Sequence, residues 1–451
     1  MTEAAIEWWG KAGQRSVERS ALVEAAKQIT RALDQIAVLP STPTLRREEI
    51  KLQIALITPL QHIKGYAAPE TKAAVEQARR LIEQAEVLGE AAEDPLLLFS
   101  ALFGAWVANL VAFNGDLVCE VAAQLLALAE KREAAVPVGH RVMGFSLLCT
   151  GRLAESRAHF DRAILLHNPG EHRSLATRFG QDVGVSARCH RSWSLWMLGY
   201  VDAALADVER ALKDARELGQ AITLAHALVT TALTHLYCGN YATANAQCNE
   251  AVILADELGA QWWKAFGMLH QGYVLTMTDK ASDAVHMITT GITEFRSTGS
   301  TMYLPFALSF LAIAHAKLGQ LEDAWHSIGE ALAAIQTTKE KWHEAEVNRI
   351  AGEVALKSPQ VNRATAEGYF ERALAVARQQ QAKSWELRAA MSMARLWHDQ
   401  GKRQQAHELL APIYGWFTEG FDTRDLKEAK ALLDTLAPQH PSPAKPARAR
   451  N

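Results

Sequence analysis

The chain has 451 residues, of which 49% are hydrophobic and 22% are charged, a composition typical of a globular rather than a disordered protein. The 47 Lys and Arg residues nearly balance the 50 Asp and Glu residues, so the formal net charge is −3. This balance argues against a nucleic-acid-binding protein, whose binding domain usually carries a basic excess on one face. The 27 Gly and 14 Pro residues are too few for a β-rich or loop-rich fold.

The amino-terminal third predicts helix pairs of irregular spacing. Small residues recur at Gly13, Ala25 and Ala32, and residues 46–85 and 95–130 carry degenerate forms of the same pattern. The chain opens with acidic residues and has no basic stretch followed by an apolar one, so we expect no signal peptide. With five cysteines and no CxxC pair, we expect reduced thiols and a cytoplasmic location.

Residues 96–113 lack charge over 18 positions, the length at which a membrane span is considered. The acidic residues Glu93, Asp94 and Asp116 flank this segment, and helical patterns continue on both sides. A helix buried among other helices has the same composition. We therefore favour a buried helix over a membrane span.

A repeat with a period of roughly 40 residues, within the range typical of solenoid proteins, dominates the rest of the chain. One small residue recurs in each unit, at Ala204, Ala244, Ala284, Ala324, Ala366 and Ala406, and the interval varies only before Ala366, where it is longer by two. Glycines recur at half the repeat length, and Asp279 takes the one position in this series that lacks a glycine. The series comprises Gly199, Gly219, Gly239, Gly259, Gly299 and Gly319. A glycine at that spacing ends a helix in the left-handed conformation, and small residues let two helices cross closely.

This pattern predicts two antiparallel helices per unit and resembles a lengthened tetratricopeptide repeat (TPR). We expect an all-α, right-handed α-solenoid of about ten antiparallel helix pairs. Residues 1–135 should form degenerate TPR-like pairs, and residues 136–436 should form the regular superhelix. Residues 437–451 are Pro-rich and basic, so we expect a disordered tail.

The most irregular stretch of the superhelix is residues 167–191, which we interpret as an inserted loop or helix extension. Its polar side chains could bind a partner or ligand, because inserted loops often carry function. The candidate loop contacts are His172, Gln181, Asp182 and His190. His and Cys residues in this stretch lack the tight spacing of a zinc site, so we predict no metal.

Aromatic residues recur at one position of successive repeats. The row comprises Trp263, Tyr303, His343 and Trp385, with Trp262 and Trp342 beside it. The first interpretation, which we favour, is packing between adjacent repeats. The second is an aromatic strip in the concave groove that binds a peptide or a small apolar ligand.

No known catalytic motif is present in the sequence. It lacks GxxxxGK[ST], GxGxxG, HExxH and GxSxG, so we expect no phosphate-binding loop, no hydrolase site, no cofactor and no enzyme activity. Carboxylate pairs such as Glu322 and Asp323 lie at a predicted helix start, where they complement the helix dipole.

Several segments resemble one family: EWWGKAGQRSVERSALVEA near the start, KGYAAPE at 64–70, RFGQDVGV at 178–185, and two near the end, QQQAKSWELRAAMSMARLW and GKRQQAHELLAPIYGWFTEGFDTRDLKEAKALLDTL. The family is the C-terminal TPR arm of bacterial signalling proteins in which a class III adenylate/guanylate cyclase domain precedes an AAA-type (STAND-like) ATPase domain. The resemblance covers residues 5–436. It implies that WWGKAGQR begins the first helix after the ATPase domain, and that the arm regulates an ATPase or cyclase, neither of which this chain contains.

Three functional hypotheses follow. The first is a non-catalytic protein-interaction arm in cytoplasmic signalling, with a protein partner along the concave face, such as an ATPase or cyclase acting in trans. The second is a sensor arm that binds a small molecule in the groove or at the 167–190 insertion. The third is a split or truncated part of an adenylate cyclase or of an ATPase-type transcriptional regulator. We expect neither nucleic acid nor a membrane as a partner.

Overall fold

The computed structural model describes residues 2–65, 68–90, 96–131, 135–358 and 362–437. These residues form helices and connecting turns, without strands. The helices are α1 (Thr2–Glu18), α2 (Leu22–Ala37), α3 (Pro43–Ile63), α4 (Pro69–Val87), α5 (Leu97–Val111), α6 (Gly115–Ala129), α7 (Val136–Cys149), α8 (Leu153–Leu166), α9 (Pro169–Phe179), α10 (Val183–Leu198), α11 (Val201–Leu218), α12 (Ala221–Cys238), α13 (Tyr241–Glu257), α14 (Gln261–Met277), α15 (Ala281–Ser297), α16 (Leu304–Lys317), α17 (Leu321–Thr338), α18 (Glu344–Lys357), α19 (Arg363–Gln379), α20 (Lys383–Asp399), α21 (Arg403–Tyr414) and α22 (Arg424–Leu436). The all-α, TPR-like solenoid is therefore confirmed.

Small residues lie where the two helices of a pair cross. A Cβ atom added to Gly272 of α14 would lie 2.4 Å from Ile288 Cγ1 of α15, and one on Gly144 of α7 would lie 2.9 Å from the Phe160 ring of α8. The recurring alanines of the second helices are fully buried. Because larger side chains would separate the backbones, these positions set how closely each pair packs.

The turns have the backbone conformation that the glycine spacing predicts. The six predicted glycines have φ between 65° and 95°, in the left-handed region that L-residues rarely adopt. Asp279, which takes the vacant position, also lies there with φ of 59°. The regular turn spacing is thus a backbone requirement of the fold.

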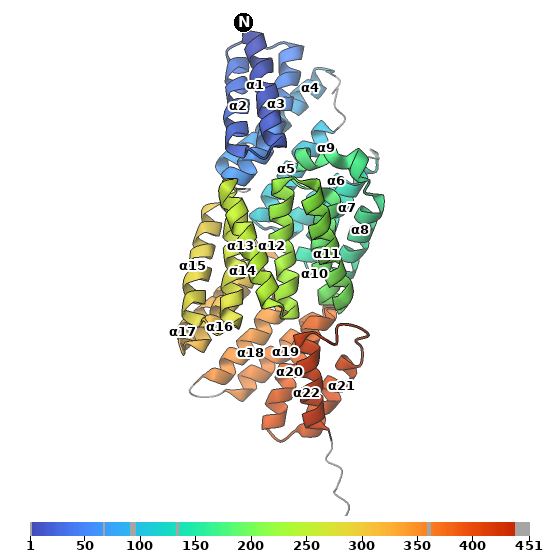
Figure 1. The fold of residues 1–451 in the computed structure, drawn as a ribbon, viewed down its shortest axis with the longest axis vertical. Helices are drawn as coiled ribbons and strands as arrows, with labels where there is room; N and C mark the ends of the chain where they lie inside the picture. Colours follow the sequence, from blue (N-terminus) through green and yellow to red (C-terminus); the bar gives the residue numbers. More distant parts are fainter. Residues whose placement is uncertain (1, 66–67, 91–95, 132–134, 359–361, 438–451) are drawn as a thin grey trace, which may run out of the picture.

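Successive turns of the superhelix contact each other directly. The amide of Met302 donates to the carbonyl of Val111 at 3.1 Å, and the amide of Lys341 donates to the carbonyl of Cys149 at 2.8 Å. The hydroxyl of Ser300 also donates to the Val111 carbonyl, across 189 residues of sequence, so one superhelical turn spans between four and five repeats. In Figure 1, α1–α4 lie at one end of the elongated molecule and α18–α22 at the other. Between these two ends, successive turns of the superhelix pack on each other and cover much of the concave face.

Helix α5 is the apolar segment of residues 96–113, and eleven of its residues are buried by neighbouring helices. Among the described residues, α12 has the length and composition of a membrane span, but 83% of that window is buried inside the protein, as in a core helix. The division at residue 135 stays a prediction. The predicted disordered tail, from residue 438 onward, lies outside the described residues.

Candidate functional site

The six residues of the predicted aromatic groove are all buried, each with at most 5% of its surface exposed. They divide into two groups. Trp262, Trp263 and Tyr303 line an interior cavity near the amino-terminal end of the superhelix. The others lie deeper in the core between superhelical turns, at Trp342, His343 and Trp385. Whether any of the six binds a partner stays a prediction.

The second group packs against aromatic residues of the preceding superhelical turn. The Trp342 ring stacks on Trp193 of α10 with centroids 5.6 Å apart, and Trp385 meets Trp196 of the same helix edge-on at 4.8 Å. Aromatic pairs in such geometries stabilise a core beyond the area they bury. These residues therefore fill the concave face from within.

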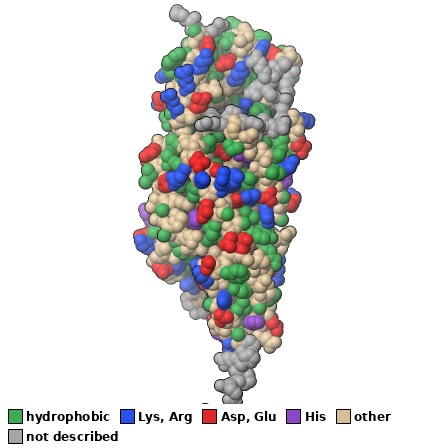
Figure 2. Space-filling model, turned by 45° about the vertical axis from the view of Figure 1, so that its right-hand side comes forward, with side chains coloured by type: hydrophobic (Ala, Val, Ile, Leu, Met, Phe, Trp, Pro, Cys, Tyr) green, Lys and Arg blue, Asp and Glu red, His purple; other side chains and the backbone are tan. Residues whose placement is uncertain are grey.

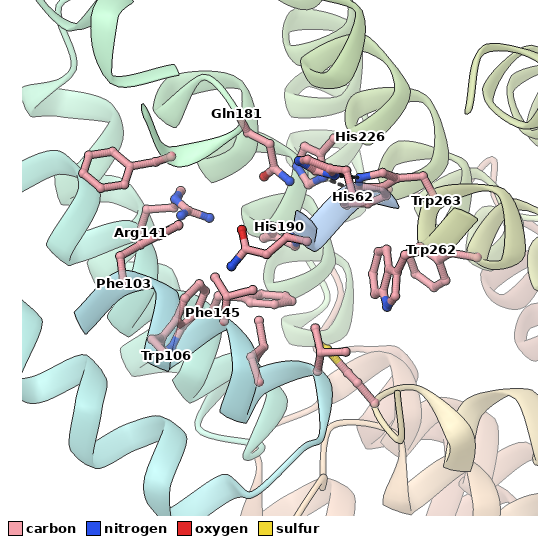
Figure 3. A pocket seen from close by; sticks show the side chains of 18 of the residues that line it. His62, Phe103, Trp106, Arg141, Phe145, Gln181, His190, His226, Trp262 and Trp263 are labelled. Atoms are coloured by element: carbon pink, nitrogen blue, oxygen red, sulfur yellow. Dashed lines mark hydrogen bonds between the residues drawn. The ribbon is translucent and has the colours of Figure 1, made fainter. Parts of the chain in front are cut away.

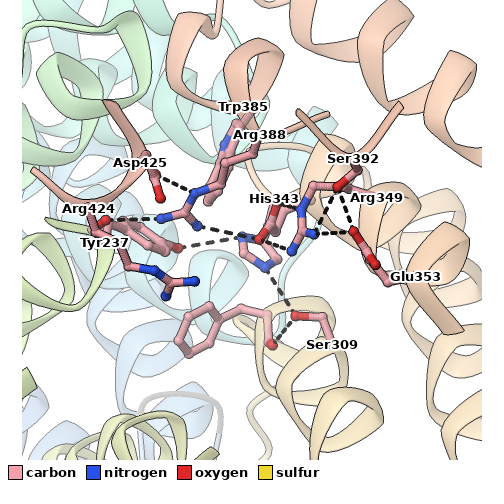
Figure 4. A network of polar contacts seen from close by, with 12 residues as sticks. Tyr237, Ser309, His343, Arg349, Glu353, Trp385, Arg388, Ser392, Arg424 and Asp425 are labelled. Atoms are coloured by element: carbon pink, nitrogen blue, oxygen red, sulfur yellow. Dashed lines mark hydrogen bonds and ion pairs between the residues drawn. The ribbon is translucent and has the colours of Figure 1, made fainter. Parts of the chain in front are cut away.

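His343 and Trp385 also border a buried ionic network, shown in Figure 4. Glu346 of α18, 2% exposed, lies 2.7 Å from Arg349 Nε and 3.4 Å from Arg388 Nη1. Burial alone would raise the pKa of Glu346, but the two guanidinium groups outweigh it and lower the pKa to about 2. Arg388 of α20 also contacts Asp425 of α22 at 2.6 Å. The network joins the last helix pairs.

The interior cavity has a volume of about 60 Å³. Its wall comes from α3, α5, α7, α9, α10, α12 and α14 and from the turns before α10 and α16, which lie far apart in the sequence. Most of the wall is apolar, with Phe, Trp and Tyr side chains as its largest part. The polar wall residues, several of which point toward one another in Figure 3, are Gln61, His62, Arg141, Gln181, His190, His226 and Thr230.

One cationic side chain, Arg141, lines the cavity. Arg141, 5% exposed, lies over the rings of Phe103 and Trp106 at 5.4 and 5.6 Å. Burial lowers the pKa of His226 to about 3, with the charge of Arg141 adding to the effect, and it likewise lowers the pKa of His190. These histidines are therefore neutral at pH 7, and the described residues that line the cavity include no Asp or Glu.

Hydrogen bonds fix some of the polar wall atoms and leave others unsatisfied. Trp263 Nε1 donates to His62 Nδ1 at 3.1 Å, and His190 Nδ1 lies 3.0 Å from the carbonyl of Ser186. The atoms Gln61 Nε2 and His226 Nε2 are buried and have no hydrogen-bond partner among the described residues. Unpaired buried polar atoms are uncommon and costly, and they mark places where a water or ligand binds.

The predicted loop contacts lie in or beside helices. Residues 169–179 form α9, which packs against α3, α5 and α10, so this stretch is not a projecting loop. Gln181 and His190 line the cavity, and Asp182 is the N-cap of α10, accepting from the amide of Val185 at 2.9 Å. The side chain of His172 lies outside the described residues. In the part of the chain that the structure describes, no three His, Cys, Asp or Glu side chains converge as a metal site.

Sequence reasoning missed the other polar wall residues, above all Arg141, His226 and Gln61. They come from three different helices, so no local motif unites them. One signal was available, because Arg141 is the only Lys, Arg, Asp or Glu in residues 136–149, an otherwise apolar helix. A lone charge in such a helix is rarely buried without a partner or role.

Comparisons with known proteins agree with the fold. No family model matches the chain. An uncharacterized protein of Rhizobium meliloti (strain 1021) is 23% identical over 355 residues, which are 77% of this chain and 33% of that protein. The chain thus spans about a third of the length of this curated relative.

Two solved structures have a similar backbone. A Rap protein complexed with the Competence and Sporulation Factor has a TM-score of 0.57 and 13% identity, covering 85% of this chain and 99% of that one. The Rap conjugation gene regulator of the plasmid pLS20, in complex with a Phr peptide, has a TM-score of 0.50 and 11% identity, covering 89% of this chain and 100% of that one. At such identities the likeness establishes the TPR-like fold alone.

Proposed function

We propose that this chain is a non-catalytic regulatory arm in cytoplasmic signal transduction, and that it binds an ATPase or cyclase domain through its amino-terminal helix pair. TPR-like solenoids typically act as binding surfaces. The long relative, of which this chain matches 33%, is consistent with an arm that works beside further domains. The resemblance to cyclase–ATPase–TPR proteins supplies the identity of the proposed partner.

The location of the partner surface follows from the filled concave face. Because aromatic side chains from successive turns occupy the interior, a folded partner has to contact the outer surface or an end. The outer face in Figure 2 carries interspersed acidic and basic side chains, without a patch of one sign. A distinctive apolar feature at an end is therefore the better guide to a partner.

That feature is Trp8 of α1, and it carries the proposal. Trp8 is 61% exposed, the largest exposed fraction of any tryptophan among the exposed hydrophobic residues of the described chain. It meets Trp9 edge-on at 4.6 Å, and Arg31 covers the Trp9 ring at 4.7 Å. Tryptophan is enriched among the residues that dominate binding energy at interfaces. Trp8 thus contacts Trp9 and leaves most of its surface exposed.

The test is an affinity capture from the native cell lysate with the intact chain, followed by mass spectrometry. We expect the wild-type chain to recover an ATPase or cyclase, and Trp8→Ala to lose it without a change in melting temperature. Ile253→Ala of α13 is the matched control, because Ile253 is also 61% exposed but lies in the middle of the solenoid. Equal recovery by all three chains would overturn the location, and recovery of other proteins alone would overturn the partner class.

A second candidate function is a small-molecule sensor, and a specific observation favours it. The wall of the cavity next to Trp262, Trp263 and Tyr303 includes two side chains, Gln61 and His226, each with a buried nitrogen that has no hydrogen-bond partner among the described residues. A ligand there would touch both superhelical turns and so bias their packing.

A further inference from the structure

Two histidines of one helix pair face each other, His140 on α7 and His159 on α8. Their Nδ1 atoms lie 3.0 Å apart, and their ring centroids lie 5.1 Å apart. The two helices cross closely one turn further along α7, where a Cβ atom on Gly144 would lie 2.9 Å from the Phe160 ring. Because the backbones approach there, the two imidazoles meet across the pair. The histidines are 19 residues apart in the sequence, so no local motif unites them.

The two rings are uncharged at neutral pH and reach the solvent. Each side chain is partly buried and partly exposed, and α8 lies at the edge of the molecule in Figure 1. Burial lowers the pKa of His140 to about 4, with the neighbouring His159 and Arg162 adding to the effect. Burial also lowers the pKa of His159, although the charge of Glu155 opposes the shift. Neutral imidazole is the form that binds metal ions.

The hydrogen bond between the rings places two potential ligand atoms side by side. One Nδ1 donates to the other, so the donor ring carries its proton on Nδ1 and the acceptor ring carries its proton on Nε2. When the donor ring also carries its proton on Nε2, both Nδ1 atoms present a lone pair. Each ring then still holds one proton, so a metal ion could bind both nitrogens at pH 7 without net release of a proton.

The spacing of the nitrogens suits a metal ion. Two metal–nitrogen bonds of about 2.0 Å place the nitrogens about 2.8 Å apart at a right angle and about 3.3 Å apart at the tetrahedral angle. The observed distance of 3.0 Å lies between these two values. Rotation of the partly exposed rings about their side-chain bonds would therefore aim both lone pairs at one ion, without a shift of either helix.

The surroundings indicate which class of metal fits. The described residues supply no third ligand, so water would complete the coordination. Glu155, one turn before His159 on α8, pairs with Arg152 at 2.7 Å, and Arg162 adds positive charge near His140. Mg²⁺ and Ca²⁺ need several oxygen ligands, which this pair lacks. Imidazole ligands instead suit Cu²⁺, Ni²⁺ and Zn²⁺.

We propose that His140 and His159 form a two-histidine site for a divalent transition metal, with Cu²⁺ bound most tightly and water in the remaining positions. For nitrogen ligands the affinity of Cu²⁺ exceeds that of the other first-row divalent ions. The proposal is independent of the partner contact at Trp8 and of the interior cavity. Because one ligand comes from each helix, the ion would link α7 to α8.

The test is calorimetric titration of the full chain with Cu²⁺, Zn²⁺ and Mg²⁺, followed by pulsed electron paramagnetic resonance of the Cu²⁺ complex. We expect one tightest Cu²⁺ site per chain with the signature of two coordinated imidazoles, Zn²⁺ at least about tenfold weaker, and no binding of Mg²⁺. A Cu²⁺ complex with fewer than two imidazoles would overturn the proposal. The absence of a saturable Cu²⁺ site would overturn it as well.

Single variants place the ion at this pair. His140→Gln and His159→Gln each remove one ligand, so we expect each to weaken Cu²⁺ at least about tenfold and to leave one coordinated imidazole. The melting temperature of each variant without metal should stay close to that of the wild type, because both positions are partly exposed. The matched control is His286→Gln, at an exposed position of α15, which should keep the wild-type affinity. Unchanged affinity in either ligand variant, or an equal loss in the control, would contradict the proposed site.

Discussion

Trp263 of α14 donates its indole N–H to Nδ1 of His62 in α3 at 3.1 Å, across 201 residues of sequence. Burial lowers the pKa of His62 to about 4, so the ring is neutral at pH 7 and its Nδ1 atom can accept a hydrogen bond. This bond ties the amino-terminal helices to the next superhelical turn at the edge of the cavity. It therefore joins the proposed partner end of the molecule to the proposed ligand site.

We expect Trp263→Phe to weaken the junction between these turns. The variant loses the hydrogen bond to His62 and leaves part of the indole volume empty, which together should lower the free energy of unfolding by about 2–4 kcal/mol. Urea denaturation measures this change. Trp416→Phe is the control, because Trp416 is 38% exposed and should change stability by under about 1 kcal/mol. Equal effects of the two substitutions would mean that the junction contributes little.

Substitution of two helical glycines by alanine should change the stability of the chain in opposite directions, because only one of them lies at a close helix crossing. In Gly272→Ala the new Cβ would lie 2.4 Å from Ile288 Cγ1, so we expect a loss of about 1–3 kcal/mol from overpacking. Gly329 of α17 has no atom within 4 Å of that position, so Gly329→Ala should stabilise the chain by about 0.5–1 kcal/mol through helix propensity. Thermal unfolding of the two variants tests the signs. A stabilising Gly272→Ala would contradict the packing described here.

The ionic network of the last helices should be sensitive to the loss of one cation. Arg388→Met leaves the buried carboxylate of Glu346 with one guanidinium fewer and removes the contact to Asp425, so we expect a loss of about 3–5 kcal/mol. Arg395→Met in the same helix breaks only a surface pair with Glu428, worth under about 1 kcal/mol. Chemical denaturation at pH 7 separates the two cases. If Arg388→Met lowers the free energy of unfolding no more than Arg395→Met does, Arg388 does not stabilise the chain through a buried ionic network.

Glu340 gives the fold a pH dependence near neutrality. This residue is 1% exposed, and burial raises its pKa from 4.5 to about 7, although Trp342 Nε1 and the amide of Tyr303 donate to it. The unfolded chain loses this proton at a lower pH than the folded chain does. The free energy of unfolding should therefore fall as pH rises from about 4.5 to 7, by about 3 kcal/mol in total.

The substitution Glu340→Gln removes this titration and keeps an acceptor for both donors. We expect the variant to match the wild type near pH 5 and to be more stable than it at pH 8, measured by urea denaturation at both values. Glu330→Gln of α17, which breaks only a surface pair with Arg296, should keep the wild-type dependence. If Glu340→Gln follows the same pH profile as the wild type, Glu340 is not the titrating group.

The sequence predicted the helix pairs well, because each repeat packs on its neighbours and the same signal recurs in every repeat. The left-handed turn at Asp279 is an example, because the regular glycine spacing alone predicted a turn at this position. The small position at Gly272 was equally local, because its neighbour Ile288 lies only one helix away.

The repeat pattern in the sequence did not predict the contacts between superhelical turns. The pairing of Trp193 with Trp342 depends on the pitch of the superhelix, which the repeat period does not encode. The aromatic row was found, but its packing against residues of the preceding turn was not. The cavity is unpredictable for the same reason, because Gln61, Arg141 and His226 meet only once the turns are stacked.

The central claim is that the superhelix closes on itself and uses its concave face as core. Hydrogen–deuterium exchange of the free chain, read at single amides by NMR or by fragmentation mass spectrometry, tests it directly. The amides of Met302 and Lys341 lie outside regular helix but donate to Val111 and Cys149 of the preceding turn. We expect both to exchange as slowly as amides of the buried helices. Exchange as fast as that of exposed turn amides would mean an open superhelix with a free groove, and would contradict this account.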